Sequence, residues 1–198
     1  MTHAHMNLPK AAANYVPLSP VSFMNSAART FPDHTAVIYG ETRRSWLQTY
    51  ARCRQLASAL TKSGLQAGDV VGFMAMNTPE LYEGHFGVPM AGMVLNALNY
   101  RLDAKTTAYI IDHAQIKLLV TDREFSNIVK AAVAMADGSP ILIDIDDPDA
   151  EGGELLGAQD YEAFIAGGDP EFSYEGPADE WDTISINYTS GTTGDPKG

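Results

Sequence analysis

The chain has 198 residues, of which 45% are hydrophobic and 19% are charged, the proportions of an ordinary folded domain with one core. No apolar run approaches the roughly 20 residues of a membrane-spanning helix, the first residues lack the regions of a secretory signal, and the net charge of −12 argues against nucleic-acid binding. Cys53 is the only cysteine, which excludes an internal disulfide and favours a reducing, cytoplasmic location.

The first part of the chain predicts a helix, a β-hairpin and a second helix. Ser19 followed by Pro20 is a helix-start signal for a helix that runs to Arg29. Residues 35–39 are rich in β-forming types, and a turn leads from them to residues 43–45. Apolar residues then recur at helical spacing and end before Gly64: Trp46, Tyr50, Cys53, Ala57 and Leu60. Cys53 lies on this stripe, so we expect a small core residue rather than a nucleophile.

A second strand and helix follow. Residues 70–76 predict a strand, and residues 77–80 supply another helix start. The helix places an apolar stripe on one side: Leu81, Tyr82, His85, Phe86 and Met90. Pro89 should kink this helix or occupy its last turn. His85 lies within the stripe, which favours a hydrogen-bonded core histidine over a ligand role.

Strands and helices continue to alternate after this point. Strands are predicted over residues 93–96, 118–121, 141–145 and 184–188, and helices over residues 104–114 and 125–136. Such alternation predicts an α/β fold in which open, mostly parallel sheets are flanked by helices. Ligands of these sheets bind beyond the carboxyl ends of the strands. We therefore expect the loop after residues 184–188 to lie in such a position.

Acidic residues crowd the segment between residues 144 and 154. The six carboxylates belong to Asp144, Asp146, Asp147, Asp149, Glu151 and Glu154. The spacing of a calcium-binding loop is absent, and Pro148 falls where ligands would alternate. We expect a solvated surface loop here, and we assign no residue to a metal.

The end of the chain carries the clearest chemical signal. Hydroxyls, glycines and one lysine are gathered in Tyr188-Thr189-Ser190-Gly191-Thr192-Thr193-Gly194-Asp195-Pro196-Lys197-Gly198. A polyphosphate needs such close backbone N–H groups, hydroxyl donors and a cation. The Walker A pattern does not fit, because the residue five after Gly191 is Pro196 and no Ser or Thr follows Lys197. The segment therefore predicts phosphate binding of another type.

This segment resembles the signature of the adenylate-forming, or AMP-binding, superfamily. That superfamily comprises acyl-CoA synthetases, luciferases and the adenylation domains of peptide synthetases. The resemblance continues upstream through residues 68–72 and 77–80. Residues 88–96 and 98–102 are similar to one branch in particular, the short- to medium-chain acyl-activating enzymes, of which bacterial 3-methylmercaptopropionyl-CoA ligases are the nearest named group.

The resemblance implies an ATP-dependent acyl-CoA ligase. Its substrates would be a small carboxylic acid, ATP with Mg²⁺, and coenzyme A. The acid would attack the α-phosphate to give acyl-AMP and pyrophosphate, and CoA would then displace AMP. The resemblance implies that the β- and γ-phosphates are contacted by Thr189, Ser190, Thr192, Thr193 and Lys197, while Gly191, Gly194 and Gly198 let the backbone fold around them. Catalytic residues stay unassigned.

The resemblance also implies a division of the chain. Residues 1–18 would form an N-terminal arm, and residues 19–198 the first part of a large N-terminal adenylation domain. The motifs for adenine, ribose and Mg²⁺, most of the acyl pocket and the small C-terminal domain would follow Gly198. We therefore expect the 198-residue segment to be inactive alone and to expose apolar strand edges.

Three alternatives stay open at this point. One is an adenylation domain that loads a carrier protein. Another is a truncated, non-catalytic paralogue that serves as an interaction module. The third concerns assembly, since the sequence leaves a homodimer open.

Overall fold

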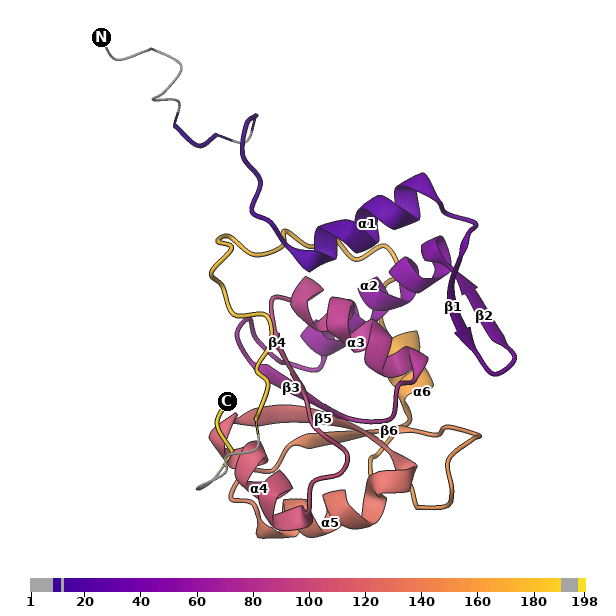
Figure 1. Cartoon of the computed structure of the whole chain (residues 1–198), viewed down its shortest axis with the longest axis vertical. Coiled ribbons are helices and arrows are strands. Elements are labelled where there is room, and N and C mark those ends of the chain that lie inside the picture. Colours follow the sequence, from indigo (N-terminus) through magenta and orange to yellow (C-terminus); the bar gives the residue numbers. More distant parts are fainter. Residues whose placement is uncertain (1–8, 12, 190–195) are drawn as a thin grey trace.

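The computed structural model describes residues 9–11, 13–189 and 196–198, and a four-stranded parallel sheet lies at its centre (Figure 1). The strands lie in the order β4-β3-β5-β6. Their bounds are β3 (Val70–Met74), β4 (Val94–Ala97), β5 (Ile116–Asp122) and β6 (Ile141–Ile145). Every neighbouring pair in this sheet is parallel. The predicted class, an open parallel α/β fold, is confirmed.

Helices cover both faces of the sheet and make three layers (Figure 1). One face carries α2 (Trp46–Lys62), α3 (Pro79–Met90) and α6 (Tyr161–Ala166). The other carries α4 (Ala104–His113) and α5 (Ser126–Met135), with the 3₁₀ turn η2 (Arg123–Phe125) before α5. Side chains of β3 point alternately to the two faces of the sheet. Val71 and Phe73 pack in the core on the α2 side, and Val70 and Met74 pack in the core on the α4 side.

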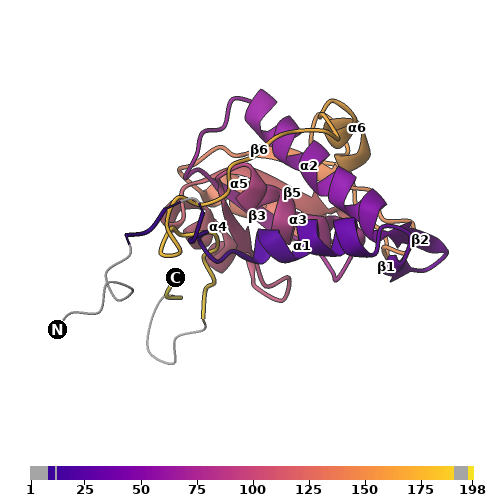
Figure 2. The same cartoon turned by 90° about the horizontal axis from the view of Figure 1, so that it is seen from above.

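The N-terminal elements pack on the outside of this body. Helix α1 (Pro20–Thr30) contacts α2 and α3, and β1 (Thr35–Tyr39) pairs antiparallel with β2 (Thr42–Ser45). The hairpin lies at the end of the molecule opposite the C-terminus (Figure 2). The predicted start of α1 is confirmed, since the Ser19 hydroxyl accepts from the N–H of Val21 and Pro20 is the first helical residue.

Close packing joins α2 to α3. A Cβ built on Gly87 would lie 2.7 Å from Cδ2 of Leu56 and 2.8 Å from the carbonyl oxygen of Cys53, so only glycine fits there. Cys53 is fully buried, and burial raises the pKa of its thiol well above the ordinary value. The prediction of a core cysteine is confirmed.

The buried face of α3 differs from the prediction. His85 is exposed rather than buried, and its Nδ1 lies 2.8 Å from the carbonyl oxygen of Leu81. The core side of the helix instead carries Glu83, Gly84, Gly87 and Val88. The physical reason is the approach distance: a Cβ on Gly84 would lie 2.9 Å from the ring of Phe73. Small residues therefore lie where neighbours approach the helix most closely, while Met90, at the end of the helix, is buried as predicted.

The acidic segment that begins near the end of β6 is only partly solvated, contrary to the prediction. Asp144 and Asp147 are buried. The Asp144 carboxylate accepts from the N–H groups of Leu156 and Gly157 at 2.9 and 2.6 Å, and Asp147 accepts from the hydroxyl of Tyr39. The following helix, α6, was not predicted. Two of the six carboxylates therefore hold loops rather than face water.

Candidate phosphate-binding loop

The segment that leads into the terminal loop docks on the edge of the sheet. The N–H of Leu95 donates to the carbonyl of Ile184 at 3.0 Å, and the N–H of Ile186 donates back to Leu95 at 2.8 Å. This is one isolated parallel bridge, between Leu95 and Ser185, rather than the predicted strand over residues 184–188. The segment departs from β4 after that bridge, so no regular ladder forms.

The side chain of Asn96 holds the segment where it leaves β4. This side chain is buried, and Nδ2 donates to the carbonyl oxygen of Ile186 at 2.8 Å. Ile184, Ile186 and Tyr188 are half-buried, while the residues between them are exposed. Sequence reasoning missed this role of Asn96, although a lone amide inside an apolar strand was an available signal, because a buried amide needs a partner.

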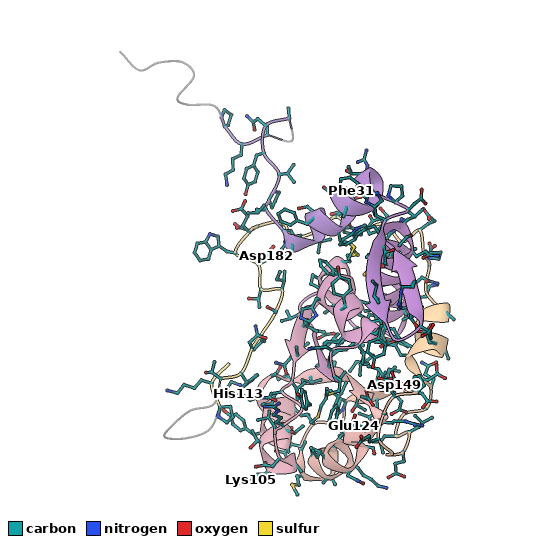
Figure 3. The ribbon with its side chains drawn as sticks, turned by 45° about the vertical axis from the view of Figure 1, so that its right-hand side comes forward. Phe31, Lys105, His113, Glu124, Asp149 and Asp182 are labelled. Atoms are coloured by element: carbon teal, nitrogen blue, oxygen red, sulfur yellow. The ribbon has the colours of Figure 1, made fainter. Side chains whose placement is uncertain are left out.

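Tyr188 ends the segment against α4. Its hydroxyl and Nδ1 of His113 are 2.6 Å apart, and their rings meet edge to face with centroids 5.7 Å apart. His113 is the last residue of α4 and lies shortly before Ile116, the first residue of β5 (Figure 3). Tyr188, the last residue before the loop, therefore contacts the end of α4, while the prediction that the loop lies beyond the carboxyl ends of the strands concerns residues 190–195, which lie outside the described residues.

The two ends of the loop pair with each other. The N–H of Thr189 donates to the carbonyl of Lys197 at 3.0 Å, and the N–H of Lys197 donates to that of Thr189 at 3.3 Å. Both residues are exposed. Among the predicted phosphate-contacting residues, the structure thus brings Thr189 and Lys197 together. The remaining five lie outside the described residues: Ser190, Gly191, Thr192, Thr193 and Gly194.

We call the paired ends of the loop, Thr189 and Lys197, the neck. Gly198 follows the neck and lies against the ring of Tyr188. A Cβ at this position would lie 2.7 Å from Cζ of Tyr188 and 2.9 Å from two further ring carbons. The backbone thus lies against the tyrosine ring, which leaves no room for a side chain. Thr189 and Lys197 are both exposed, and the Thr189 hydroxyl makes only a long contact of 3.5 Å to the carbonyl oxygen of Lys197, so a hydroxyl and an ammonium that together suit an oxyanion lie here.

A pocket of about 500 Å³ lies at the opposite edge of the sheet, where β6 ends and α3 and α6 begin. Its charged lining consists of Arg44 and seven acids: Glu41, Glu80, Asp146, Asp147, Asp149, Asp160 and Glu162. Figure 3 shows Asp149 on the far side of the molecule from His113. Such an excess of carboxylates repels a polyphosphate, so this pocket does not compete for the nucleotide.

Within residues 9–11, 13–189 and 196–198, the helices lack the combination of length and hydrophobicity that a membrane span requires. The same ranges contain no group of three His, Cys, Asp or Glu side chains arranged to hold a metal ion.

Comparison with known proteins links the geometry to a family. The sequence model of the family "AMP-binding enzyme" matches residues 24–198. An acetate–CoA ligase of Humulus lupulus is 45% identical over 97% of this chain and 36% of its own length. A peroxisomal acetate/butyrate–CoA ligase and a peroxisomal benzoate–CoA ligase of Arabidopsis thaliana are each 43% identical over 97% of the chain. The chain spans about a third of the length of these relatives.

Solved structures agree in fold. An anthranilate CoA ligase in complex with anthranoyl-AMP superposes with a TM-score of 0.81 at 20% identity, over 95% of this chain and 35% of that one. A long-chain-fatty-acid–CoA ligase of Archaeoglobus fulgidus gives 0.76 at 19% identity, over 93% and 36%. At these identities the likeness concerns the fold alone.

Proposed function

The chain belongs to the family of AMP-binding enzymes, and from that premise we propose that the protein is an ATP-dependent acyl-CoA ligase. The observation that carries the proposal is the 45% identity along 97% of the chain to a ligase whose name specifies acetate and CoA. Two further relatives at 43% identity are also named as CoA ligases. Residues 1–18 would be an arm, and residues 19–198 the first part of the large domain.

The proposed reaction has two steps. A carboxylate oxygen of the acid attacks the α-phosphorus of ATP, the bond from that phosphorus to its bridging oxygen breaks, and pyrophosphate leaves. The sulfur of CoA then attacks the acyl carbonyl carbon, and AMP leaves. Negative charge grows on the pyrophosphate in the first step, so fixed donors near it stabilise the transition state.

The neck of the terminal loop supplies two such donors. We assign the ammonium of Lys197 and the hydroxyl of Thr189 to the β- and γ-phosphates, together with the loop residues between them. Backbone pairing sets the separation of these two residues before ATP binds, which lowers the entropic cost of orienting them. When bound, Mg²⁺ would neutralise part of the phosphate charge, and we assign it no ligand among the described residues.

The substrate class follows from the relatives' names as a proposal. Those names specify acetate, butyrate and benzoate. We propose a short- or medium-chain acid, with 3-methylmercaptopropionate as the leading candidate. The protein would act in the cytoplasm, although two of the named relatives are peroxisomal, and microscopy of a tagged copy in the native cell decides the location.

A substrate panel tests the proposal. The full-length protein is incubated with ATP, Mg²⁺, CoA and one acid at a time: acetate, butyrate, 3-methylmercaptopropionate or benzoate. We expect acyl-CoA and AMP in equal amounts, with no product when acid or CoA is omitted. Release of ADP instead of AMP, or AMP formation that does not depend on any acid, contradicts the proposal.

A further inference from the structure

One contact outside the predicted motif lies directly behind the loop. The Tyr188 hydroxyl and Nδ1 of His113 are 2.6 Å apart, a distance of a strong hydrogen bond. His113 also stacks on Tyr109, with ring centroids 5.3 Å apart and planes 26° from parallel. The imidazole is therefore held from two sides, by a ring of its own helix and by the residue that precedes Thr189.

Helix α4, which carries His113, is held firmly against the sheet. Helix α4 is capped at its start by Asp103, whose carboxylate accepts from the N–H of Thr106 at 2.8 Å. Ile110 and Ile111, in its last turns, are each 1% exposed. Burial of both side chains fixes the end of α4 on the sheet, so His113 offers Tyr188 a fixed point rather than a mobile one.

Tyr188 in turn touches both ends of the loop. It is bonded covalently to Thr189, and its ring lies against Gly198, which follows Lys197. The two backbone hydrogen bonds between Thr189 and Lys197 lie between these two points. A shift of the Tyr188 ring would therefore change the surface on which Gly198, the residue after Lys197, rests.

We propose that His113 is a positioning residue for the phosphate-binding loop, acting through the hydroxyl of Tyr188. This inference rests on the proposed function, because it concerns the step in which pyrophosphate leaves. The hydrogen bond holds Tyr188, Tyr188 holds the neck, and the neck places Lys197 where charge develops. Donors placed in advance do not need to be oriented at the moment of reaction.

Four variants of the full-length protein test the chain of contacts. His113→Ala and Tyr188→Phe each remove one side of the hydrogen bond, and the third variant combines them. His113→Asn keeps a polar atom near the position of Nδ1. For each we measure acid-dependent exchange of pyrophosphate into ATP, with its kcat and its KM for ATP, and separately thioester formation from preformed acyl-AMP.

We expect each single loss to slow adenylation by about three- to tenfold, the range that one hydrogen bond of ordinary strength gives. Thioester formation should change less than twofold. The double variant should be no slower than either single one, because both changes remove the same interaction, and His113→Asn should recover most of the rate. Multiplying effects in the double variant, equal slowing of both half-reactions, or unchanged exchange would overturn the proposal.

His85→Ala is the matched control. His85 is also an exposed helical histidine whose Nδ1 lies 2.8 Å from an oxygen, but that oxygen is the carbonyl of Leu81 on its own helix, α3. We expect it to leave both half-reactions unchanged. A wild-type protein without activity on any acid would remove the proposed function, and this inference with it. If the wild type is active and the His113 and Tyr188 variants have the same rates in both half-reactions, the positioning role is contradicted while the proposed function stands.

Discussion

Thr189 and Lys197 are eight positions apart in the chain, yet their backbones are joined by two hydrogen bonds of 3.0 and 3.3 Å. The loop between them therefore starts and ends at one point. This pairing fixes the backbone from which the Lys197 side chain extends. An exposed ammonium on a fixed backbone is suited to meet a charge that appears only during the reaction.

Removing the ammonium tests this role. In the full-length protein we expect Lys197→Met to slow pyrophosphate exchange by about 10²-fold, the size found when one transition-state donor is lost. Thioester formation from acyl-AMP should slow much less, because pyrophosphate has already left. Rapid-quench measurement of the two half-reactions checks the split. Lys105→Met, on exposed α4 surface, is the control, and equal slowing of both half-reactions by Lys197→Met contradicts the assignment.

A methyl group at Gly198 tests the packing of the neck. The new Cβ would lie 2.7 Å from Cζ of Tyr188, so the ring or the backbone must move. We expect Gly198→Ala to slow adenylation by roughly tenfold or more, because misplacement of about 1 Å can cost about 10²-fold. Gly167→Ala serves as the control, since its nearest neighbour is at 3.5 Å. Wild-type exchange kinetics in Gly198→Ala would show that the ring contact is not needed.

Local signals in the sequence predicted most of the fold. Helix starts are decided within a few residues, so Ser19 with Pro20 and Thr78 with Pro79 were sufficient to place the starts of α1 and α3. The strands of the central sheet are short apolar runs between turn residues, which is also a local pattern. The likeness of the terminal segment to a known signature added Thr189 and Lys197, which the structure brings together.

Contacts between distant residues were not predictable in the same way. The exposure of His85 follows from Phe73 and Leu56, which approach α3 so closely that glycines must face them. The burial of Asp144 depends on N–H groups 12 and 13 residues later. The pairing of His113 with Tyr188 spans 75 positions. None of these partners is visible in a local pattern, because each depends on how the layers pack.

Removal of one partner from the buried ion pair between α2 and α3 should be strongly destabilising, because it leaves a buried charge. The side chain of Glu83 is fully buried and accepts from Nε of Arg52 at 2.6 Å and from Arg44 at 2.9 Å. Arg52→Ala would leave a buried carboxylate with fewer partners. We expect the free energy of unfolding to fall by about 3–5 kcal/mol, measured by urea denaturation. A loss below about 1 kcal/mol would show that water or Arg44 replaces the lost guanidinium.

The matched control for that pair is Lys130→Ala. Its ammonium is 2.7 Å from the Glu154 carboxylate, but these side chains are 65% and 54% exposed. Exposed pairs are worth about 0–1 kcal/mol because water screens them. The comparison therefore tests the effect of burial, although Arg52 also pairs with the exposed carboxylate of Glu162 whereas Lys130 pairs with Glu154.

Asp122, at the end of β5, has a carboxylate that the fold does not fully satisfy. The residue is buried, its Oδ1 accepts from the N–H of Glu124 at 3.0 Å, and Oδ2 has no hydrogen-bond partner among the described residues. Burial raises the pKa of this carboxyl, and the nearby charges of Asp147 and Glu80 raise it further. The folded state therefore holds the proton more tightly than the unfolded state.

Asp122 costs no stability below its ordinary pKa of 3.8, and stability is lost as the pH rises through its higher folded pKa. Asp122→Asn should therefore raise the melting temperature at pH 7 by a few degrees, on the order of 2–4 °C, and the gain should shrink as the pH falls toward 4. Asp103→Asn should behave in the opposite way, because its bond from the N–H of Thr106 lowers the pKa of Asp103, so its loss should be largest at neutral pH. Calorimetry between pH 4 and 7 compares the two, and a gain from Asp122→Asn that does not vary with pH would show that the charge of Asp122 is not its cause.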